Sequence, residues 1–406
     1  MDILTILSSV LDEAYLPNEY PALAALEAEW TVKRPFKGLR VLVATPIYRN
    51  TMMQYCVLLA GGAELLVGIS GMNDGEIVKF LKDNGIPVVT PEEMLKAESR
   101  GEFVDLVLDC AGPFAGLHPK IGFVELTRSG VQYYKDAKKP VFVADSGIVK
   151  RIETSLGTGD GYFRALEQLG FGKKSENSEV DFEGKRLLVF GSGKVGSGIA
   201  LQGVRRGCQV TVVTDLSSSR SGAEVADLSS EKMPAGDFSS MLWQNGVQIV
   251  DCHDYDDVAS QIYAADFVVT ATGIQNALDV AELQEALLAT PAVLANMGVE
   301  DEYGAAIPAE RVLNNKGPLN FILEEPTHLK YIDTSLALHA ALAELLVRES
   351  AGNSQSDSEG TASEEMMGLR YPPQEIEQRL LSIAIQDGVV GPEICNMLGG
   401  IPPEMD

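Results

Sequence analysis

Short apolar runs rich in β-branched residues alternate with longer amphipathic segments from Arg40 onward. In the first part of the chain these runs occupy residues 40–45, 64–70, 87–89, 105–110 and 140–145. Gly, Pro or Asp bounds each run, and intervening segments such as GEIVKFLKDNG (75–85) carry apolar residues at helical spacing. The alternation predicts strand–helix units on a parallel sheet, so residues 1–155 are expected to form one α/β domain.

A second series of strands and helices follows the glycine-rich GTGDG (157–161) and the polar stretch 173–185. Its apolar runs lie at 186–190, 209–215, 247–251, 266–273, 292–298 and 319–323. Six short strands separated by helix-length segments are typical of a doubly wound nucleotide-binding sheet. Residues 156–330 are therefore predicted to form a second Rossmann-like parallel-sheet domain, inserted between parts of the first.

The sequence pattern in the last part of the chain predicts a helix that returns to the first domain, then a linker and a tail. Segment 331–349 has an apolar face at helical spacing, with Asp333 or Thr334 as its N-cap, and is assigned to the first domain. Segment 350–365 has almost no apolar residue to bury and is predicted to be an unfolded, flexible linker. The tail, 366–406, contains one expected helix, QEIEQRLLSIAIQDG.

Composition narrows the class of partner. The chain is 45% hydrophobic and 22% charged, which is typical of a globular protein, and its net charge of −26 opposes binding to nucleic acid or anionic lipid. No uncharged apolar stretch approaches the ~20 residues of a membrane span, and MDILTILSSV lacks the basic segment of a secretory signal. We therefore expect a cytoplasmic protein that acts on a small molecule, with no nucleic-acid and no membrane partner.

Cysteines and histidines give no metal-binding pattern. The five cysteines form no C-x-x-C, and no pair of the four histidines has the spacing of a metal-binding helix motif, so no metal is expected. His253, in the loop CHDYDD, is typical of a solvated loop residue, and its acidic neighbours offer two alternatives, a metal site or an elevated pKa. His339 is typical of a helix-face residue.

The motif GSGKVG (191–196) carries the most informative chemistry. It follows the strand RLLVF directly and opens a helix that starts near Lys194 and Val195. In this context Gly191 permits a tight turn, Gly193 lets the backbone approach a pyrophosphate, and Gly196 lets the helix pack closely on the strand. The first N–H groups of the helix then face the anion, which predicts a dinucleotide cofactor.

Asp215 favours NAD over NADP. It ends the next strand, 24 residues after Gly191, where a carboxylate accepts both ribose hydroxyls and repels a 2′-phosphate. The alternative stays open at this point, because polar residues that could hold a phosphate follow at once: Ser217, Ser218, Ser219 and Arg220.

Several segments together resemble S-adenosylhomocysteine hydrolase. The likeness lies in GSGKVGSG with VTVVTD, then TATGI (270–274), NMGVEDE (296–302) and PLNF (318–321). More diffusely it includes LDCAG (108–112), VELTRSGV (124–131) and ADSGIVKRIETSLGTGDG (144–161). The resemblance implies a homo-oligomer, expected to be a dimer, and an NAD that transiently oxidises a ribose 3′-hydroxyl.

The same resemblance implies the cofactor contacts. They run from the glycine loop to the nicotinamide, with two hydroxyls from the first domain: Gly193, Val195, Asp215, Ala271, Thr272, Gly273, Ile274, Asn296, Gly298, Asn320, Thr127 and Ser129.

The family's catalytic residues are not retained. On this alignment they fall at Pro46, Cys110, Leu126, Val149 and Val299. Elimination of a thiol needs a positioned base and a protonated leaving group, so hydrolysis of S-adenosylhomocysteine is not expected.

Other ionisable residues are candidates to replace them. Lys150 and Glu153 follow a strand end, and His328 follows the last expected strand, so all three are predicted to lie near interdomain hinges at 150–160 and 323–330. Lys150 and Glu153 are equally typical of a solvated first helical turn, and Cys110 is either a buried thiol or a reserve nucleophile.

Two functions follow from this pattern. The first is an NAD-dependent oxidoreductase-type enzyme that oxidises, net or transiently, an alcohol or amine of a small polar or nucleoside-like substrate. The second is a catalytically silent NAD-binding relative that acts as a regulator or scaffold.

Overall fold

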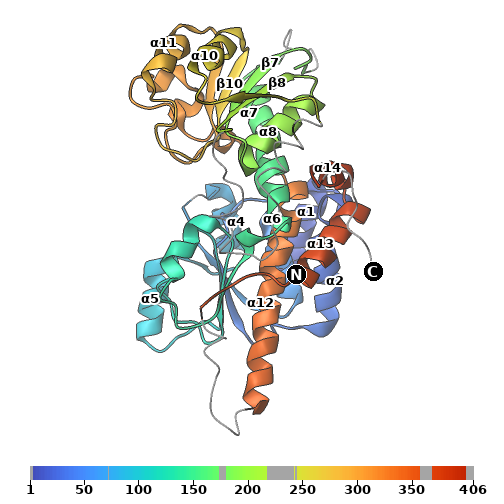
Figure 1. Cartoon of the computed structure of the whole chain (residues 1–406). Helices are drawn as coiled ribbons and strands as arrows, with labels where there is room; N and C mark the ends of the chain where they lie inside the picture. Colours follow the sequence, from blue (N-terminus) through green and yellow to red (C-terminus); the bar gives the residue numbers. More distant parts are fainter. Residues whose placement is uncertain are drawn as a thin grey trace. The chain divides into compact units, whose positions relative to one another are not determined.

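The computed structural model describes residues 3–71, 73–172, 180–216, 242, 245–356 and 368–398 (Figure 1). The chain forms two compact units, which are described separately below. Unit 1 comprises Met1–Lys150 and Leu329–Asp406, and unit 2 comprises Arg151–His328. The prediction of a parallel-sheet α/β fold is confirmed, because every paired strand in the described residues runs parallel to its neighbours.

Within its described residues, unit 1 is built on a seven-stranded sheet in the order β12-β6-β5-β4-β1-β2-β3. The strands are β1 (Arg40–Val43), β2 (Glu64–Gly68), β3 (Val88–Val89), β4 (Leu106–Asp109), β5 (Gly122–Glu125), β6 (Val141–Val143) and β12 (Leu369–Arg370). The direction of winding reverses at β1, which lies between β2 and β4. At such a switch point the loops after the two strands diverge, and ligands of α/β proteins bind there, beyond the carboxyl ends.

Helices cover the sheet of unit 1. They are α1 (Ile3–Ala14), α2 (Pro21–Lys33), α3 (Met52–Ala60), α4 (Gly75–Asp83), α5 (Pro91–Ser99), α12 (Leu329–Ser356), α13 (Gln374–Asp387) and α14 (Gly391–Met397). The largest core cluster includes Trp30 of α2, Tyr55 of α3 and Leu342 of α12, packed with inward residues of the central strands. On a second face, Phe114 and Tyr134 belong to a smaller cluster with Met94 of α5.

The start of α12 differs from the sequence expectation. The helix begins at Leu329, so Asp333 and Thr334 lie inside it and neither is its N-cap. Instead, the two carboxylate oxygens of Asp333 accept the backbone N–H groups of Ala22 and Leu23, each at 2.9 Å. These are the first amides of α2, whose own N-cap residue supplies no side-chain acceptor, so a buried acid from another helix caps it.

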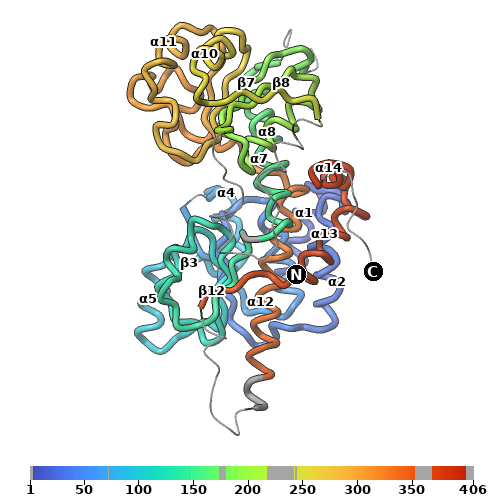
Figure 2. Tube along the Cα trace, in the orientation of Figure 1, coloured from blue at the N-terminus to red at the C-terminus, as the bar shows by residue number. Residues whose placement is uncertain are grey.

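The segments after α12 also differ from expectation. The helix continues to Ser356, so the first part of the expected linker 350–365 is helical, and the remainder lies outside the described residues. The tail contains a strand and a second helix besides the expected one. Figure 2 traces it back to the sheet, where Leu369 and Arg370 pair with Val141 and Phe142 of β6.

Unit 2 has a five-stranded sheet in its described residues, in the order β11-β10-β7-β8-β9. The strands are β7 (Arg186–Phe190), β8 (Gln209–Thr214), β9 (Gln248–Asp251), β10 (Phe267–Thr270) and β11 (Val293–Asn296). The main helices are α7 (Thr158–Gln168), α8 (Lys194–Arg205), α10 (Tyr255–Ala264) and α11 (Ala281–Ala289). The switch point lies between β7 and β10, as in doubly wound nucleotide-binding folds.

The prediction of a strand at 319–323 is wrong. Leu319–Ile322 is a short 3-10 helix, and only Pro318 makes an isolated bridge, to Asn296. Pro318 has no N–H to give to a strand ladder, and its carbonyl instead accepts the N–H of Phe321 at 3.2 Å.

Gly159 of GTGDG lies in a helix and packs closely against another helix. The π-helical segment η4 (Ile152–Gly157) continues directly into α7. A Cβ at Gly198 of α8 would lie 1.9 Å from the carbonyl oxygen of Ser155, and one at Gly159 would lie 2.5 Å from that of Gly198. These glycines are required because the two helical segments touch backbone to backbone. Across the described residues, no helix is long and apolar enough to span a membrane.

Candidate dinucleotide-binding site

The glycine loop 191–196 connects β7 to α8 in a tight turn. Gly191 has a φ of +105°, and a Cβ there would lie 2.5 Å from the carbonyl oxygen of Ala271. A Cβ at Gly196 would lie 1.9 Å from the carbonyl oxygen of Gly191. By contrast, a Cβ at Gly193, the N-cap residue of α8, would meet nothing within 4 Å. The first and third glycines are therefore required by the protein's own packing, whereas the space beside the second is open.

Hydroxyl groups hold this loop in shape. Ser197 Oγ donates to the carbonyl of Ser192 at 2.7 Å, and Ser192 Oγ lies 2.8 Å from Thr214 Oγ1 at the end of β8. Helix α8 begins at Lys194 and Val195 without a side-chain cap, and such a helix start favours an anion. The loop thus offers backbone amides to a phosphate group.

Asp215 follows β8 and lies beside residues from the end of β9. Its Oδ1 is 3.7 Å from Nδ1 of His253, and the same ring nitrogen is 3.0 Å from Oδ1 of Asp251. The backbone N–H of His253 also donates to Asp251, and these two hydrogen bonds lower the pKa of that carboxyl group. His253 is therefore held in a defined position, which the sequence did not predict. Residues 217–220, the alternative phosphate cradle, lie outside the described residues.

A buried carboxylate joins the loops after β10 and β11. Glu302 is fully buried and accepts three hydrogen bonds: from Thr272 N at 2.8 Å, Thr272 Oγ1 at 2.8 Å and Gly273 N at 2.7 Å. A Cβ at Gly298 would lie 2.1 Å from its Oε1. Glu302 ends the motif NMGVEDE, but the sequence alone indicated no role for it. The sequence feature that could have indicated this role is an acidic residue four positions after a glycine, shortly after the end of a strand.

Asn296 is a structural residue of the same region. Its Oδ1 accepts Thr270 Oγ1 and Gly298 N at 2.9 Å each, and its Nδ2 donates to the carbonyls of Glu300 at 2.7 Å and Lys316 at 2.6 Å. Since these bonds use both ends of its buried amide, Asn296 shapes the loop that carries Gly298.

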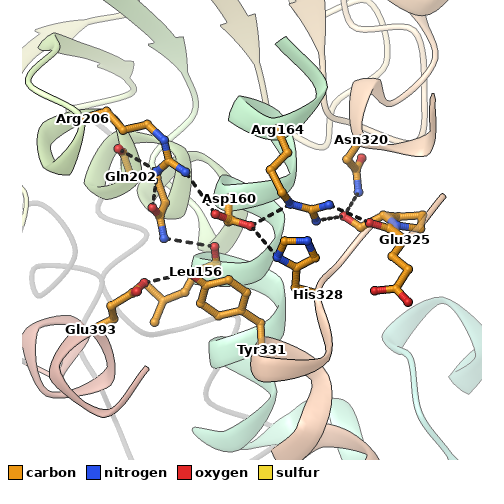
Figure 3. A network of polar contacts seen from close by, with 11 residues as sticks. Leu156, Asp160, Arg164, Gln202, Arg206, Asn320, Glu325, His328, Tyr331 and Glu393 are labelled. Carbon is orange, nitrogen blue, oxygen red and sulfur yellow. Dashed lines mark hydrogen bonds and ion pairs between the residues drawn. The ribbon is translucent and has the colours of Figure 1, made fainter. Parts of the chain in front are cut away.

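Side chains of α7 hold the segment that contains Asn320 and His328 (Figure 3). Asp160 accepts a hydrogen bond from Arg164 Nε at 2.8 Å and from Arg206 Nη2 at 3.0 Å, and its Oδ2 lies 3.6 Å from Nδ1 of His328. Arg164 also donates to the carbonyl of Glu325 at 3.0 Å. Asn320 is nearly buried and contacts the same segment. An imidazole whose Nδ1 faces a buried carboxylate has a fixed orientation.

Lys150 and Glu153 are placed at the start of this helical stretch. Lys150 lies in α6 (Val149–Arg151) and is 2% exposed, so the alternative of a solvated first helical turn is wrong for this residue. Glu377 of α13 accepts the N–H of Val149 at 3.2 Å, next to Lys150. Glu153 belongs to η4 and is partly buried.

Thr127 and Ser129 follow β5 in unit 1, at the carboxyl edge of its sheet. Thr127 Oγ1 donates to Glu125 Oε1 at 2.6 Å and accepts the N–H of Ala111 at 2.9 Å, while Ser129 Oγ donates to Thr127 Oγ1 at 3.2 Å. In this structure the threonine hydroxyl organises its own edge of the sheet.

Two buried acids occupy the ends of β4 and β5. Asp109 and Glu125 face each other across the ladder, and burial raises the pKa of both, that of Asp109 to about 7. Tyr134 Oη donates to Asp109 at 2.6 Å, and Cys110 N donates to it at 2.9 Å. Cys110 itself is partly buried, so its exposure does not decide between a buried thiol and a reserve nucleophile.

Three kinds of known protein are similar to this chain. Residues 179–296 match the family described as putative NAD(P)-binding. The chain is 26% identical over 316 residues to an adenosylhomocysteinase of Thermoplasma acidophilum, covering 70% of this chain and 67% of that protein. It is 24% identical over 325 residues to that of Thermoplasma volcanium, covering 72% and 70%. The solved structure of a dipicolinate synthase chain from Bacillus halodurans superposes with a TM-score of 0.44 at 13% identity and covers 77% of this chain and 98% of that one.

These findings confirm two predictions. The sequence resemblance to adenosylhomocysteinases extends over most of the chain, and the prediction of a nicotinamide dinucleotide cofactor is supported by the matched family. The chain is an NAD-binding protein that is similar in sequence to adenosylhomocysteinases.

Proposed function

We propose that this adenosylhomocysteinase-like chain is an NAD-dependent enzyme that oxidises an alcohol or amine of a small polar or nucleoside-like substrate. The oxidation is either the net reaction or a transient step that is later reversed. Unit 2 takes the cofactor role, and unit 1 takes the substrate role.

The arrangement of the glycine loop carries this proposal. The loop, Asp215 and the loop after β10 all follow carboxyl ends of strands around the β7–β10 switch point, where dinucleotides bind in this class of fold. The open space beside Gly193 fits the close approach of a pyrophosphate, and the half-exposed carboxylate of Asp215 fits a ribose. Bound there, NAD would supply a hydride acceptor.

His328 is the proposed acid–base residue with the best-defined surroundings. Asp160 faces Nδ1 of the ring, and the opposite ring nitrogen, Nε2, is the one suited to exchange a proton with a substrate hydroxyl or amine. Asp160 is in turn fixed by Arg164 and Arg206. This carboxylate–imidazole pair is what a general base needs from its neighbours.

Lys150 and Glu153 complete the proposed catalytic set, and Cys110 stays a reserve nucleophile. Lys150 is buried in α6. Either residue could hold an anionic or hydroxyl group of the substrate.

The substitutions at the family's catalytic positions support altered chemistry. Leu126 and Val149 have hydrocarbon side chains, which can neither take up nor release a proton, and both are buried in the main core cluster of unit 1. A second candidate, a catalytically silent NAD-binding regulator or scaffold, is favoured by the same two residues. We further propose, from the resemblance, a homodimer located in the cytoplasm.

Cofactor binding is tested first by mass spectrometry of small molecules released from the denatured protein, and by calorimetry with NAD. Gly193→Val should lower NAD affinity at least ~100-fold by filling the space of the pyrophosphate. The matched control is Gly75→Val, which also lies at a helix start where a Cβ meets nothing within 4 Å. Equal affinity of wild type and the Gly193 variant contradicts the cofactor site.

Turnover is tested by following nicotinamide reduction with a panel of alcohols, amines and nucleosides. Reduction by any of them supports the enzyme. If no member of a broad panel is oxidised by protein that binds NAD, the silent relative becomes the better proposal.

A further inference from the structure

We propose that Asp251 and His253 form, with Asp215, a second NAD-selective element at the adenosine end of the cofactor site. The proposal rests on the proposed NAD site and adds to it the residues that exclude a 2′-phosphate. We call these three residues the adenosine-end cluster.

The cluster joins the ends of two neighbouring strands. Asp215 directly follows β8, Asp251 is the last residue of β9, and Thr214 and Asp251 are partners in the β8–β9 ladder. His253 Nδ1 lies between the two carboxylates, 3.0 Å from Asp251 Oδ1 and 3.7 Å from Asp215 Oδ1. The three side chains therefore share one edge of the sheet.

Two hydrogen bonds fix the orientation of the histidine. Its backbone N–H donates to Asp251 Oδ1 at 3.1 Å, and its ring Nδ1 approaches the same oxygen. An ionised carboxylate can only accept, so Nδ1 of the ring is the donor in this contact. The Sγ of Cys252 also lies 3.6 Å from Nδ1.

Charge makes this cluster selective. The carboxylates of Asp215 and Asp251 attract the hydroxyl donors of a ribose and repel a phosphate ester. A single carboxylate at the end of β8 is the usual device for this choice, and here Asp251 adds a second one. Because the carboxylates are part-exposed, the added repulsion is moderate and falls with salt.

The test compares dissociation constants for NAD and NADP in wild type and three variants. Asp251→Asn should lower the preference for NAD about 5- to 10-fold at low salt, and about 2-fold in 0.5 M salt. His253→Gln should lower it less, since the carboxylates remain. The matched control is Asp256→Asn, which removes one exposed negative charge from the first turn of α10, and it should change the ratio less than 2-fold.

The outcomes separate this inference from the proposed function. An unchanged NAD to NADP ratio in Asp251→Asn, with NAD bound normally by wild type, overturns only the inference. A wild-type preference for NADP also overturns it. Absence of dinucleotide binding by wild type overturns the proposed function and the inference together.

Discussion

The hydrogen bonds of Glu302 predict a large effect of one substitution in unit 2. Glu302→Ala removes the acceptor of three donors, Thr272 N, Thr272 Oγ1 and Gly273 N, inside a fully buried site. Each backbone donor left without a partner costs about 1–3 kcal/mol, and the hydroxyl can turn to another acceptor. We therefore expect a loss of about 4 kcal/mol, a large part of the stability of an ordinary domain.

Hydrogen exchange measured by mass spectrometry is the suitable assay, because a chain of two units need not unfold in one step. Peptides that cover 267–274 and 293–302 report on β10, β11 and their loops. A loss of this size corresponds to roughly 1,000-fold faster exchange of amides that open with the unit, since 1.4 kcal/mol is tenfold. NAD affinity should fall as well, because the loop 271–273 loses its anchor.

Two further variants make the test specific. Glu300→Ala, on the exposed part of the same loop, should leave exchange unchanged. Thr272→Val should cost about 1 kcal/mol more in the wild-type background than in Glu302→Ala, because the hydrogen bond to Glu302 is already gone in the second background. Exchange in Glu302→Ala within 3-fold of wild type would refute the reasoning.

Three further predictions follow. S-adenosylhomocysteine should not be hydrolysed at ~1 per second or more, because Val149 replaces an ionisable group, and chromatographic assay of adenosine and homocysteine checks this. With a substrate in hand, Lys150→Met, Glu153→Gln and His328→Gln should each lower turnover ~100-fold or more while calorimetry shows unchanged NAD binding; near-normal turnover of all three contradicts the set. Burial raises the pKa of Asp333 from 3.8 to about 7, so its contribution to the free energy of unfolding is full below about pH 4 and is lost as pH rises through 7. The free energy of unfolding, measured with urea from pH 4 to 8, should therefore depend less steeply on pH in Asp333→Asn than in wild type. An equal slope in the two proteins contradicts the prediction.

The regular elements of both sheets were predictable because each depends on its own sequence. A buried parallel strand must be apolar along its length, so runs such as RLLVF and DLVLDC are visible without any partner. The glycine loop was visible for the same local reason. Elements whose form depends on distant partners were misjudged. Asp333 was expected as an N-cap of its own helix, but it lies inside that helix and accepts the first amides of α2.

The residues of the candidate site also fall into a group that the sequence shows and a group that it does not show. The glycines of the loop and Asp215 follow strand ends at a fixed spacing, which a sequence displays. Asp160 contacts Arg206 and His328, which lie far along the chain, and Glu302 acquires its role from Thr272. His253 was visible as a residue, but only the neighbouring strand end shows that it faces Asp215. Contacts between residues far apart in the chain produce no periodic pattern in the sequence.

The strand β12 makes the first sheet depend on the order of protein synthesis. Its outermost strand, Leu369–Arg370, is translated after all of unit 2, yet it covers the edge of β6, which ends at Val143. Until then, β6 presents unpaired N–H and C=O groups, which are a template for pairing with another chain. A nascent chain, or one shortened after α12, therefore carries an open sheet edge that the longer chain hides, and aggregation during synthesis is the expected cost of this topology.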